Sequence, residues 1–554
     1  MQRLGFGTGS RSAKAVLLAV SVVVTAVVCA GGLAATPKRA ANQSLVIQQG
    51  IAPILDPAFF TNSNNYTLVN NLFETLVKKG QRGRLVPGLA LSWSSRDNKT
   101  WTFALRTNAR FSDGSRITAA GVRASLVRAF TPITNAQMQA LGVTNTFPQG
   151  FTVIPELLGA SAVQNGRAQA IPARAITAPN ARTLRIVLEE PRSDLPERLT
   201  FPAFGIAKMA NVEGGSGTTP WWYRPVSSGP FAVSSFVPNT SVTIVPNRRY
   251  YGTKAVLQKV EFKVVTNTQT AEIAYQSGDL DFVKTVYSDV LNLQSKGLQS
   301  QMRAYTDLNV SNFIVNGQVE PTDDPAVVRA LAMAIDRTTL TRTVLDGLVQ
   351  PTTTFTPPGL APGYSSKGFQ NGYRFNVSAA RAELAKSKYG SSITIRAWAS
   401  SSQDPRAIQA IAQMWQQNLG IRVSIQTSLN PAQAPKSQAA NVIFSAQGAT
   451  FAAPCAMMQR WPDFIVFASG ANNVNFGAVQ NPRIKAAMDA CYAASPKNVW
   501  SKVMAAENVM AETPQFIPVH YNRSFYLVKP KIRGLALGPY WNIANLSSVW
   551  VAAS

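Results

Sequence analysis

The sequence predicts an α/β protein that folds as two or three lobes. The chain has 554 residues, which exceeds the size of one ordinary hydrophobic core. Apolar residues make up 46% of it, enough for packed interiors. Segments with strand periodicity alternate with segments of helical periodicity along most of the chain. The sequence has no repeat of fixed period and no long low-complexity linker, so we expect short strand connections between lobes, which can act as a hinge.

The first half is predicted to contain both strands and amphipathic helices. Residues 44–50 are typical of a strand entering a loop, and residues 66–80 carry leucines at helical spacing. Thr118 is a candidate N-cap for a helix over 118–130. The remaining predictions are strands at 100–106, 183–191 and 259–265, a two-stranded meander at 227–252, and a helix from 268 that ends at Gly278 before a short strand.

The second half alternates in the same way and implies a second α/β lobe. The last strand is expected to return the chain to the first lobe. Helices are predicted at 325–346, 378–388, 405–419, 482–494 and 498–512, and strands at 393–398, 422–426 and 516–530.

The N-terminus has the pattern of a secretory signal, predicted over residues 1–35. Arg3, Arg11 and Lys14 precede an apolar stretch that runs from Ala15 to about Ala35. Val28 stands before Cys29, where a lipoprotein signal needs a small residue, so lipid attachment is not expected. Because the apolar stretch is long, an uncleaved membrane anchor is the alternative.

The strong positive charge suggests anionic partners but not nucleic acid. Lys and Arg number 53 against 27 Asp and Glu, a net charge of +26. The basic residues are scattered, without a long basic run, zinc-finger spacing or RNA-binding signature. We therefore expect a solvated basic surface. Few carboxylates also predict a stability that changes little as pH falls.

The sequence argues against an enzyme and against a metal cofactor. It contains no GxSxG elbow, Walker loop or HExxH motif. Its one histidine, His520, cannot form a histidine cluster for nickel or zinc. We predict no cofactor, although a haem ligand on His520 stays open beside a role in the core or the wall of a cleft.

Two cysteines remain after the signal, Cys455 and Cys491. An exported protein meets oxidising conditions, and the count is even, so we predict a disulfide between them. Two buried free thiols are the alternative.

An ordered set of short motifs covers nearly everything from residue 45 to residue 535. Any one motif is weak, but the order and spacing of the set are specific. The set comprises LDPAFF (55–60), NLFETLVKKG (71–80), LVPGLALSW (85–93), WTFALRTNARFSDGSRITAAGVRAS (101–125), SSGPFAV (227–233), PNRRYYG (246–252), SGDLDFV (277–283), VVRALAMAIDRTTL (327–340), WQQNLGIRV (415–423), VNFGAVQNPRI (474–484) and FIPVHY (516–521). With these motifs the chain resembles the extracellular solute-binding protein family 5, the dipeptide-, oligopeptide- and nickel-binding proteins.

The resemblance implies a periplasmic binding protein type II-like fold, with two lobes, a hinge and an extra N-terminal subdomain. It also implies a substrate-binding component of an ABC importer, which closes on a peptide-like or other small polar solute and delivers it to membrane permeases. The expected parts are lobe I at 43–75, 195–305 and 517–554, the inserted subdomain at 76–194, and lobe II at 306–516. The expected hinge strands are 306–316 and 516–525.

The sequence departs from peptide-binding relatives at one point in lobe II. Those relatives place an aspartate after a Gly-Trp pair, where it pairs with the peptide's α-ammonium. The corresponding stretch here, residues 442–461, contains no acidic residue. Because an unpaired buried ammonium costs several kcal/mol, we expect a ligand with an uncharged, blocked or anionic end.

The candidate ligand residues are mostly neutral polar side chains, which fix a neutral polar ligand through hydrogen bonds. For each of them a place in a solvent-exposed loop is the alternative. They are Asn62, Asn64, Asn65, Tyr66, Asn309, Asn312, Ser400, Ser401, Ser402, Gln403, Gln447, Thr450, Phe451 and His520.

The predicted partners are a peptide or small-molecule ligand and the permease subunits, with no nucleic acid and a monomeric chain. Without a lipid anchor, a freely soluble receptor needs an outer barrier, so we expect the periplasm. The alternative function is an exported scaffold or regulator that keeps the fold and has lost transport, which the missing aspartate favours.

Overall fold

A single large mixed sheet organises most of the chain. The computed structural model describes residues 38–60, 63–80, 83–213, 220–317, 319–370, 372–400, 403–428, 440–449, 451–460, 482–512, 516–538, 542–543 and 545–553. The strand order of the sheet is β15-β14-β16-β12-β17-β11-β1-β10-β9-β8, with β13 paired to β17. The strands are β1 (Ser44–Gln49), β8 (Phe231–Val237), β9 (Ser241–Pro246), β10 (Lys259–Val264), β11 (Phe282–Thr285), β12 (Met302–Val315), β13 (Gln350–Pro351), β14 (Thr394–Ser400), β15 (Arg422–Ser428), β16 (Val442–Gly448) and β17 (Phe516–Val528).

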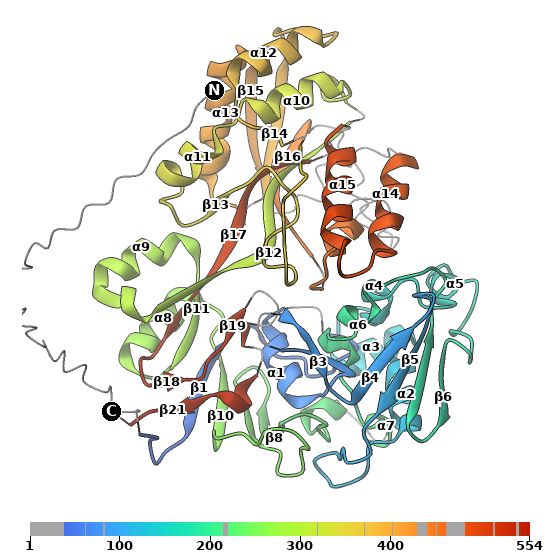
Figure 1. Cartoon of the computed structure of the whole chain (residues 1–554). Coiled ribbons are helices and arrows are strands. Elements are labelled where there is room, and N and C mark those ends of the chain that lie inside the picture. The colour runs from blue at the N-terminus through green and yellow to red at the C-terminus, as the bar shows by residue number, and fades with distance from the viewer. Residues whose placement is uncertain are drawn as a thin grey trace, which may run out of the picture. The chain divides into compact units, whose positions relative to one another are not determined.

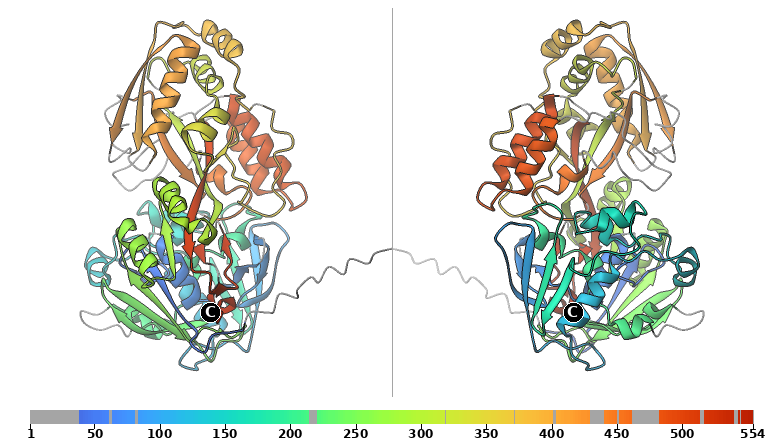
Figure 2. Two further views of the ribbon diagram at one scale, coloured as in Figure 1. Left: turned by 90° about the vertical axis from the view of Figure 1, so that its left-hand side faces the viewer. Right: turned by 90° about the vertical axis from the view of Figure 1, so that its right-hand side faces the viewer.

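Two long antiparallel strands, β12 and β17, lie at the centre of this sheet and connect its two halves (Figure 1). In Figure 2, β17 (red) runs from the region coloured yellow and orange to the region coloured blue and green. The pairing is interrupted by a register shift between Thr306 and Val310, so residues 307–309 form a bulge. Bulges bend a strand and increase its twist. The predicted domain boundaries and hinge strands stay predictions.

A separate four-stranded sheet, in the order β4-β5-β7-β6, is built by residues 90–187. Its inward positions carry Trp101, Phe103 and Leu184, all buried, as strand alternation requires. Its strands are β4 (Ala90–Ser95), β5 (Thr100–Leu105), β6 (Ile176–Asn180) and β7 (Thr183–Val187). The short two-stranded pairs are β2 (Val77–Lys79) with β3 (Leu85–Pro87), β18 (Ile532–Arg533) with β21 (Trp550–Val551), and β19 (Leu537–Gly538) with β20 (Asn542–Ile543).

Two main hydrophobic cores hold the helices against these sheets. One contains Trp415 of α13, whose indole N–H donates to the Leu331 carbonyl at 2.9 Å. The other joins the N-terminal strands to residues 451–458 and to helices α14 and α15. The helices are α1 (Tyr66–Leu72), α2 (Ala119–Arg128), α3 (Asn135–Leu141), α4 (Gly150–Val153), α5 (Ala160–Gln164), α6 (Leu195–Arg198), α7 (Met209–Glu213), α8 (Thr268–Ser277), α9 (Val290–Leu293), α10 (Pro325–Met333), α11 (Arg337–Thr339), α12 (Val377–Lys386), α13 (Pro405–Leu419), α14 (Pro482–Tyr492) and α15 (Val499–Glu512).

One predicted helix is wrong in extent. The helix expected over 66–80 ends at Leu72, because Phe73 is extended and Val77 pairs with Pro87 in a hairpin. Residues 325–346 are mainly helical as predicted, in separate elements: α10 ends at Met333, and α11 begins after Asp336, whose carboxylate accepts from the Thr339 backbone N–H at 3.0 Å. At residues 73–77 a tertiary strand pairing outweighs helical spacing.

The predicted disulfide is confirmed: Cys455 and Cys491 are bonded. Within the described ranges, no helix has the length and apolarity needed to cross a membrane. The predicted signal and its alternative, an uncleaved anchor, lie outside the described residues.

Candidate functional site

A cavity of about 200 Å³ opens at the carboxyl ends of β1, β10 and β11. Strand β1 runs parallel to both neighbours, and ligands of open α/β sheets bind beyond such strand ends. The cavity wall combines aromatic and polar side chains. Its lining residues are Ile47, Gln48, Gln49, Gly50, Asn64, Thr67, Phe262, Thr266, Thr268, Phe282, Lys284, Thr285, Val286 and Tyr526.

Amide side chains position the polar wall of this cavity. The Gln49 amide donates to Asn65 Oδ1 at 3.1 Å, and the Gln48 amide donates to the Val265 carbonyl at 3.0 Å. Asn65 is 1% exposed, and its Nδ2 has no hydrogen-bond partner among the described residues. An unsatisfied buried donor costs free energy, and this amide lies next to the cavity lining through its hydrogen bond with Gln49.

Among the predicted residues that follow LDPAFF, Asn64 lines this cavity and Asn65 lies beside it. Tyr66 instead packs edge-on against Phe60 and Phe201, at ring-centroid distances of 5.4 Å each. Asn62 lies outside the described residues.

A second polar cluster forms where β12 and β17 meet the start of α13. The buried Ser311 hydroxyl lies 2.8 Å from Gln403 Oε1 and 2.8 Å from Asn522 Oδ1. His520 pairs with Ser311 across the two strands and contacts the Phe444 ring edge-on. The structure therefore brings the predicted residues Gln403 and His520 together, and adds Ser311 and Asn522.

His520 is 8% exposed, and its Nδ1 has no hydrogen-bond partner among the described residues. Burial lowers the pKa of His520 to about 4, against the opposing influence of the Tyr521 backbone and the Asp404 charge. The imidazole is therefore neutral at physiological pH and can donate or accept one hydrogen bond at each nitrogen.

Other predicted residues surround this cluster. Asn312 and Ser400 are buried, at the centre of β12 and the end of β14. Gln447 on β16 pairs with Val310, and Asn309 pairs with Gly448. Ser401, Ser402 and Thr450 lie outside the described residues.

Phe451 lies against charged residues rather than in a cavity. It is 2% exposed, and the Arg198 guanidinium stacks on its ring at 4.6 Å. Tyr492 faces Arg198 at 5.7 Å and Arg192 at 4.1 Å. The disulfide thus joins two segments whose rings contact the same arginine. The role of Phe451 in ligand binding stays a prediction.

Arg198 is fully buried and belongs to a network that the sequence analysis missed, the arginine cluster of Glu156, Arg192, Asp194 and Arg198. Arg198 pairs with Glu156 at 2.8 Å and Asp194 at 3.0 Å, and Arg192 pairs with Glu156 at 2.8 Å. Burial raises the pKa of Asp194, whereas for Glu156 the two arginines overcome burial and the pKa is lowered. The many charged residues in 189–198 could have indicated this cluster, but a run of charges on an exposed surface has the same appearance in a sequence.

Lys79 and Glu197, both half-buried, influence each other electrostatically near this cluster. Burial lowers the pKa of Lys79 to about 8, although Glu197 opposes this change. Burial raises the pKa of Glu197 to about 7. The Lys79 ammonium also donates to the Ala452 carbonyl at 2.9 Å, so this lysine ties the β2 hairpin to the segment that contains Phe451.

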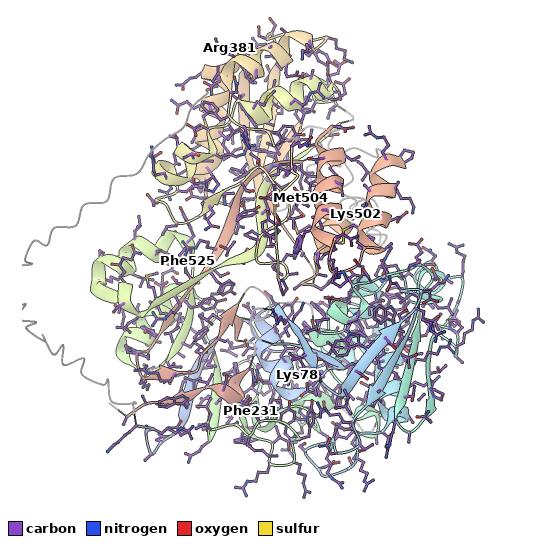
Figure 3. The ribbon with its side chains drawn as sticks, viewed as in Figure 1. Lys78, Phe231, Arg381, Lys502, Met504 and Phe525 are labelled. Atoms are coloured by element: carbon purple, nitrogen blue, oxygen red, sulfur yellow. A yellow bond between two sulfur atoms is a disulfide. The ribbon has the colours of Figure 1, made fainter. Side chains whose placement is uncertain are left out.

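A second cavity, of about 60 Å³, is lined by Glu74, Lys78 and Lys79 among others. The ammonium of Lys78, a residue of β2 that is labelled in Figure 3, donates to the Tyr250 hydroxyl at 2.9 Å. The Tyr250 hydroxyl in turn donates to Glu74. Lys78, Tyr250 and Glu74 therefore hydrogen-bond to one another, and we interpret this cavity as part of the folded framework rather than as a ligand site.

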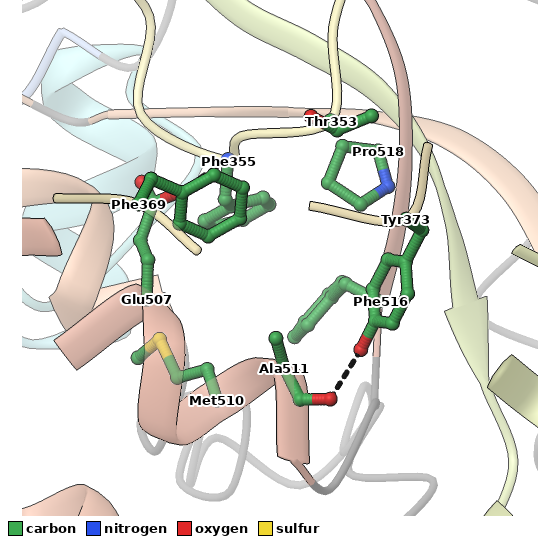
Figure 4. A pocket seen from close by; sticks show the side chains of 9 residues that line it. All are labelled: Thr353, Phe355, Phe369, Tyr373, Glu507, Met510, Ala511, Phe516 and Pro518. Carbon is green, nitrogen blue, oxygen red and sulfur yellow. Dashed lines mark hydrogen bonds between the residues drawn. The ribbon is translucent and has the colours of Figure 1, made fainter. Parts of the chain in front are cut away.

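The cavity of Figure 4 is the smallest of the three, about 20 Å³, with room for a single water. Tyr373 donates to the Ala511 carbonyl at 2.5 Å across its edge. The Glu507 carboxylate accepts from the backbone N–H groups of Thr356 at 2.8 Å and Phe355 at 3.2 Å, which fixes the loop over α15. Nothing larger than water fits here. In the described part of the chain, no three His, Cys, Asp or Glu side chains gather as a metal site would require.

The large sheet is shared by two α/β cores, and a polar cavity lies beyond its parallel strand ends. A second polar cluster lies on the strands that connect the two cores. This arrangement is that of the two-lobed solute-binding proteins. Residues 84–463 match the family model described as "Bacterial extracellular solute-binding proteins, family 5 Middle". The chain belongs to this family.

Individual relatives agree over nearly the whole length. The periplasmic murein peptide-binding protein MppA of Escherichia coli is 26% identical over 510 residues, which covers 90% of this chain and 91% of MppA. The probable deoxycholate-binding periplasmic protein YgiS of Escherichia coli is 25% identical over 500 residues, covering 87% and 88%. The unliganded open form of MppA superposes with a TM-score of 0.76 at 25% identity, covering 94% of this chain and 99% of MppA.

These findings confirm the predicted family, the type II-like fold class and the role of substrate-binding component of an ABC importer. The scaffold alternative is not favoured. Family members are binding proteins, and several relatives are periplasmic.

Proposed function

We propose that this chain is a periplasmic receptor for a peptide-like solute whose amino end carries no free ammonium. The observation that carries the proposal is the absence of any acidic residue from residues 442–461. Described residues of this stretch offer Gln447 and the β16 backbone instead, which suit an uncharged group.

The relatives support a broad ligand class. One is named for murein peptides, and another for deoxycholate, a molecule with a carboxylate and no amine. A receptor of this family therefore need not recognise an ammonium. We propose further that the chain performs no catalysis and acts as a monomer with permease partners.

The domain boundaries remain part of this proposal. We infer lobe I at 43–75, 195–305 and 517–554, the subdomain at 76–194, and lobe II at 306–516. The four-stranded sheet of residues 90–187 and the position of β12 and β17 support this division. Polar groups of the cavity and of the Ser311 cluster would then contact the solute from two lobes, which is what closure on a ligand requires.

The test compares matched tripeptides with a free and an acetylated amino end, by thermal shift and calorimetry on the mature chain. At about a hundredfold above its Kd, a true ligand adds about 2.7 kcal/mol of stability. We expect protection by acetylated peptides and little by free ones. Equal protection would contradict the argument from the missing carboxylate, and no protection by any peptide would contradict the peptide class.

A further inference from the structure

We propose that Lys284 forms an anion subsite, which binds a carboxylate or similar anionic end of the solute in the cavity beyond β1, β10 and β11. The proposal rests on the proposed function and makes it more specific, since it assigns a charge to one end of the ligand. It concerns this chain's own lysine, on the strand between β1 and β17.

Lys284 is the cationic side chain of the cavity lining, which contains no acidic side chain. Its backbone N–H donates to Gln48 Oε1 at 3.0 Å, which fixes the strand edge. Its ammonium makes no hydrogen bond or ion pair with any described residue. A cation held in a concave wall without a partner favours an anionic guest.

The surrounding charges leave this ammonium available. Asp307, in the β12 bulge, is the acid that influences Lys284 electrostatically, but its carboxylate accepts from the Asn309 N–H at 2.8 Å and the Ser524 hydroxyl at 3.3 Å. The other acid on this strand edge, Asp281, pairs with Lys531 at 2.7 Å. Glu272 accepts from the hydroxyl of Thr285 and is not among the residues that line the cavity.

The electrostatic environment differs from that of a surface lysine. The Lys284 side chain has a large exposed area, yet desolvation lowers its pKa. The two facts agree if the exposed area faces a hollow rather than open solvent, as its place in the cavity lining indicates. A desolvated ammonium gains more from an anion than a hydrated one does.

The remaining wall suits the neighbouring part of such a ligand. Tyr526 stacks between Phe282 at 5.0 Å and Tyr305 at 5.7 Å and gives a rigid aromatic side. Gln49, Asn64 and Thr67 give the polar side. A volume of about 200 Å³ is below the roughly 300–1,000 Å³ of sites for whole small molecules, so the cavity holds one terminal unit of a longer solute.

The test uses a small probe that fits this volume: N-acetylglycine, with N-acetylglycinamide as its uncharged counterpart. Binding to the mature chain is measured by ligand-observed NMR for the wild type and for Lys284→Met. Lys263→Met is the matched control, because Lys263 is an exposed lysine on β10, on the other side of β1 in the same sheet, and is not among the residues that line the cavity. Lys284→Arg keeps the cation and covers the case in which the methionine variant does not fold.

We expect the wild type to bind the acid about tenfold more tightly than the amide, the size of one charge-assisted hydrogen bond. The preference is expected to vanish in Lys284→Met and to persist in Lys263→Met and Lys284→Arg. No preference in the wild type, an unchanged preference in Lys284→Met, or an equal loss in Lys263→Met each overturns the subsite.

The outcomes separate this inference from the proposed function. If acetylated peptides bind but the wild type shows no preference for the acid probe, the subsite is wrong and the receptor function stands. If no peptide binds but the acid probe binds through Lys284, the subsite stands and the peptide class is wrong.

Discussion

At the scale of single residues, His520 and Arg198 show how burial determines the behaviour of a charged group. His520 lies on β17 beside Ser311, and its Nδ1 meets no hydrogen-bond partner in the part of the chain that the structure describes. Arg198 is surrounded by two carboxylates and two rings. One side chain is kept neutral by its surroundings, and the other is kept charged by its partners.

The stability contribution of His520 is expected to depend on pH. Its folded pKa of about 4 lies below the ordinary histidine value of 6.5, so between these values the unfolded state binds more protons. The contribution, about 3 kcal/mol, is present above pH 6.5 and lost as pH falls through the folded pKa. Urea unfolding of wild type and His520→Gln at several pH values measures it.

The comparison with His520→Gln is needed because other groups act in the opposite direction. Glu197, with its pKa raised to about 7, contributes stability below its unfolded pKa of 4.5, and this contribution is lost as pH rises through 7. We expect the variant to lose less stability than the wild type between pH 6.5 and 4. Parallel curves for the two proteins would contradict a neutral buried His520.

Truncation of Arg198 is expected to be strongly destabilising. Arg198→Met leaves Glu156 and Asp194 buried with one cation fewer, which costs about 3–5 kcal/mol. Arg185→Met, on the exposed face of β7, is the control and should change stability by about 0.5 kcal/mol or less. Chemical denaturation of both variants measures the difference, and similar values for the two would contradict the role of the arginine cluster.

At the scale of elements, the sequence predicted most strands and helices because hydrophobic period and capping agree there. Thr118 caps α2 and Gly278 ends α8, as expected. The helix predicted over 66–80 failed because Val77 has helical spacing but pairs in a hairpin, a contact that period alone cannot show. The disulfide was predictable because only two cysteines follow the predicted signal segment.

Loss of the disulfide is expected to cost stability through the segment it closes. Cys455 and Cys491 are 36 residues apart, so the double variant to alanine should be about 2–4 kcal/mol less stable. A reducing agent should lower the melting temperature of the wild type and leave the variant unchanged. A reductant effect on the variant of the same size would show that it acts elsewhere.

At the scale of the whole molecule, the ordered motifs predicted the family, while the composition of the site was only partly accessible. Gln403 follows a predicted strand, His520 lies on one and Asn64 follows the LDPAFF motif, so the sequence could place them among the candidate residues. Ser311, Asn522 and Lys284 were missed, because their meeting depends on which strands of the central sheet are neighbours. Without knowledge of the strand order, the sequence does not show that Lys284 and Tyr526 line the same cavity.

The net charge of +26 is expected to act on the rate of ligand capture. Association of an acetylated peptide acid should slow about tenfold when ionic strength rises from about 0.01 M to about 1 M, because salt screens the attraction. The amide of the same peptide is the control and should show little change. Stopped-flow kinetics measure both association rates. If the rates of the acid and the amide depend equally on salt, the electrostatic field of the chain does not guide the anion.

The bulge at residues 307–309 has a mechanical consequence. Because β12 and β17 belong to one continuous sheet, their hydrogen bonds oppose any sliding of its halves, and bending concentrates where the ladder is interrupted. Asp307 stands at that point and electrostatically influences Lys284. We therefore expect a change of bend at residues 307–309 to alter the electrostatic potential at Lys284, which would couple bending of the sheet to binding of an anion in the cavity.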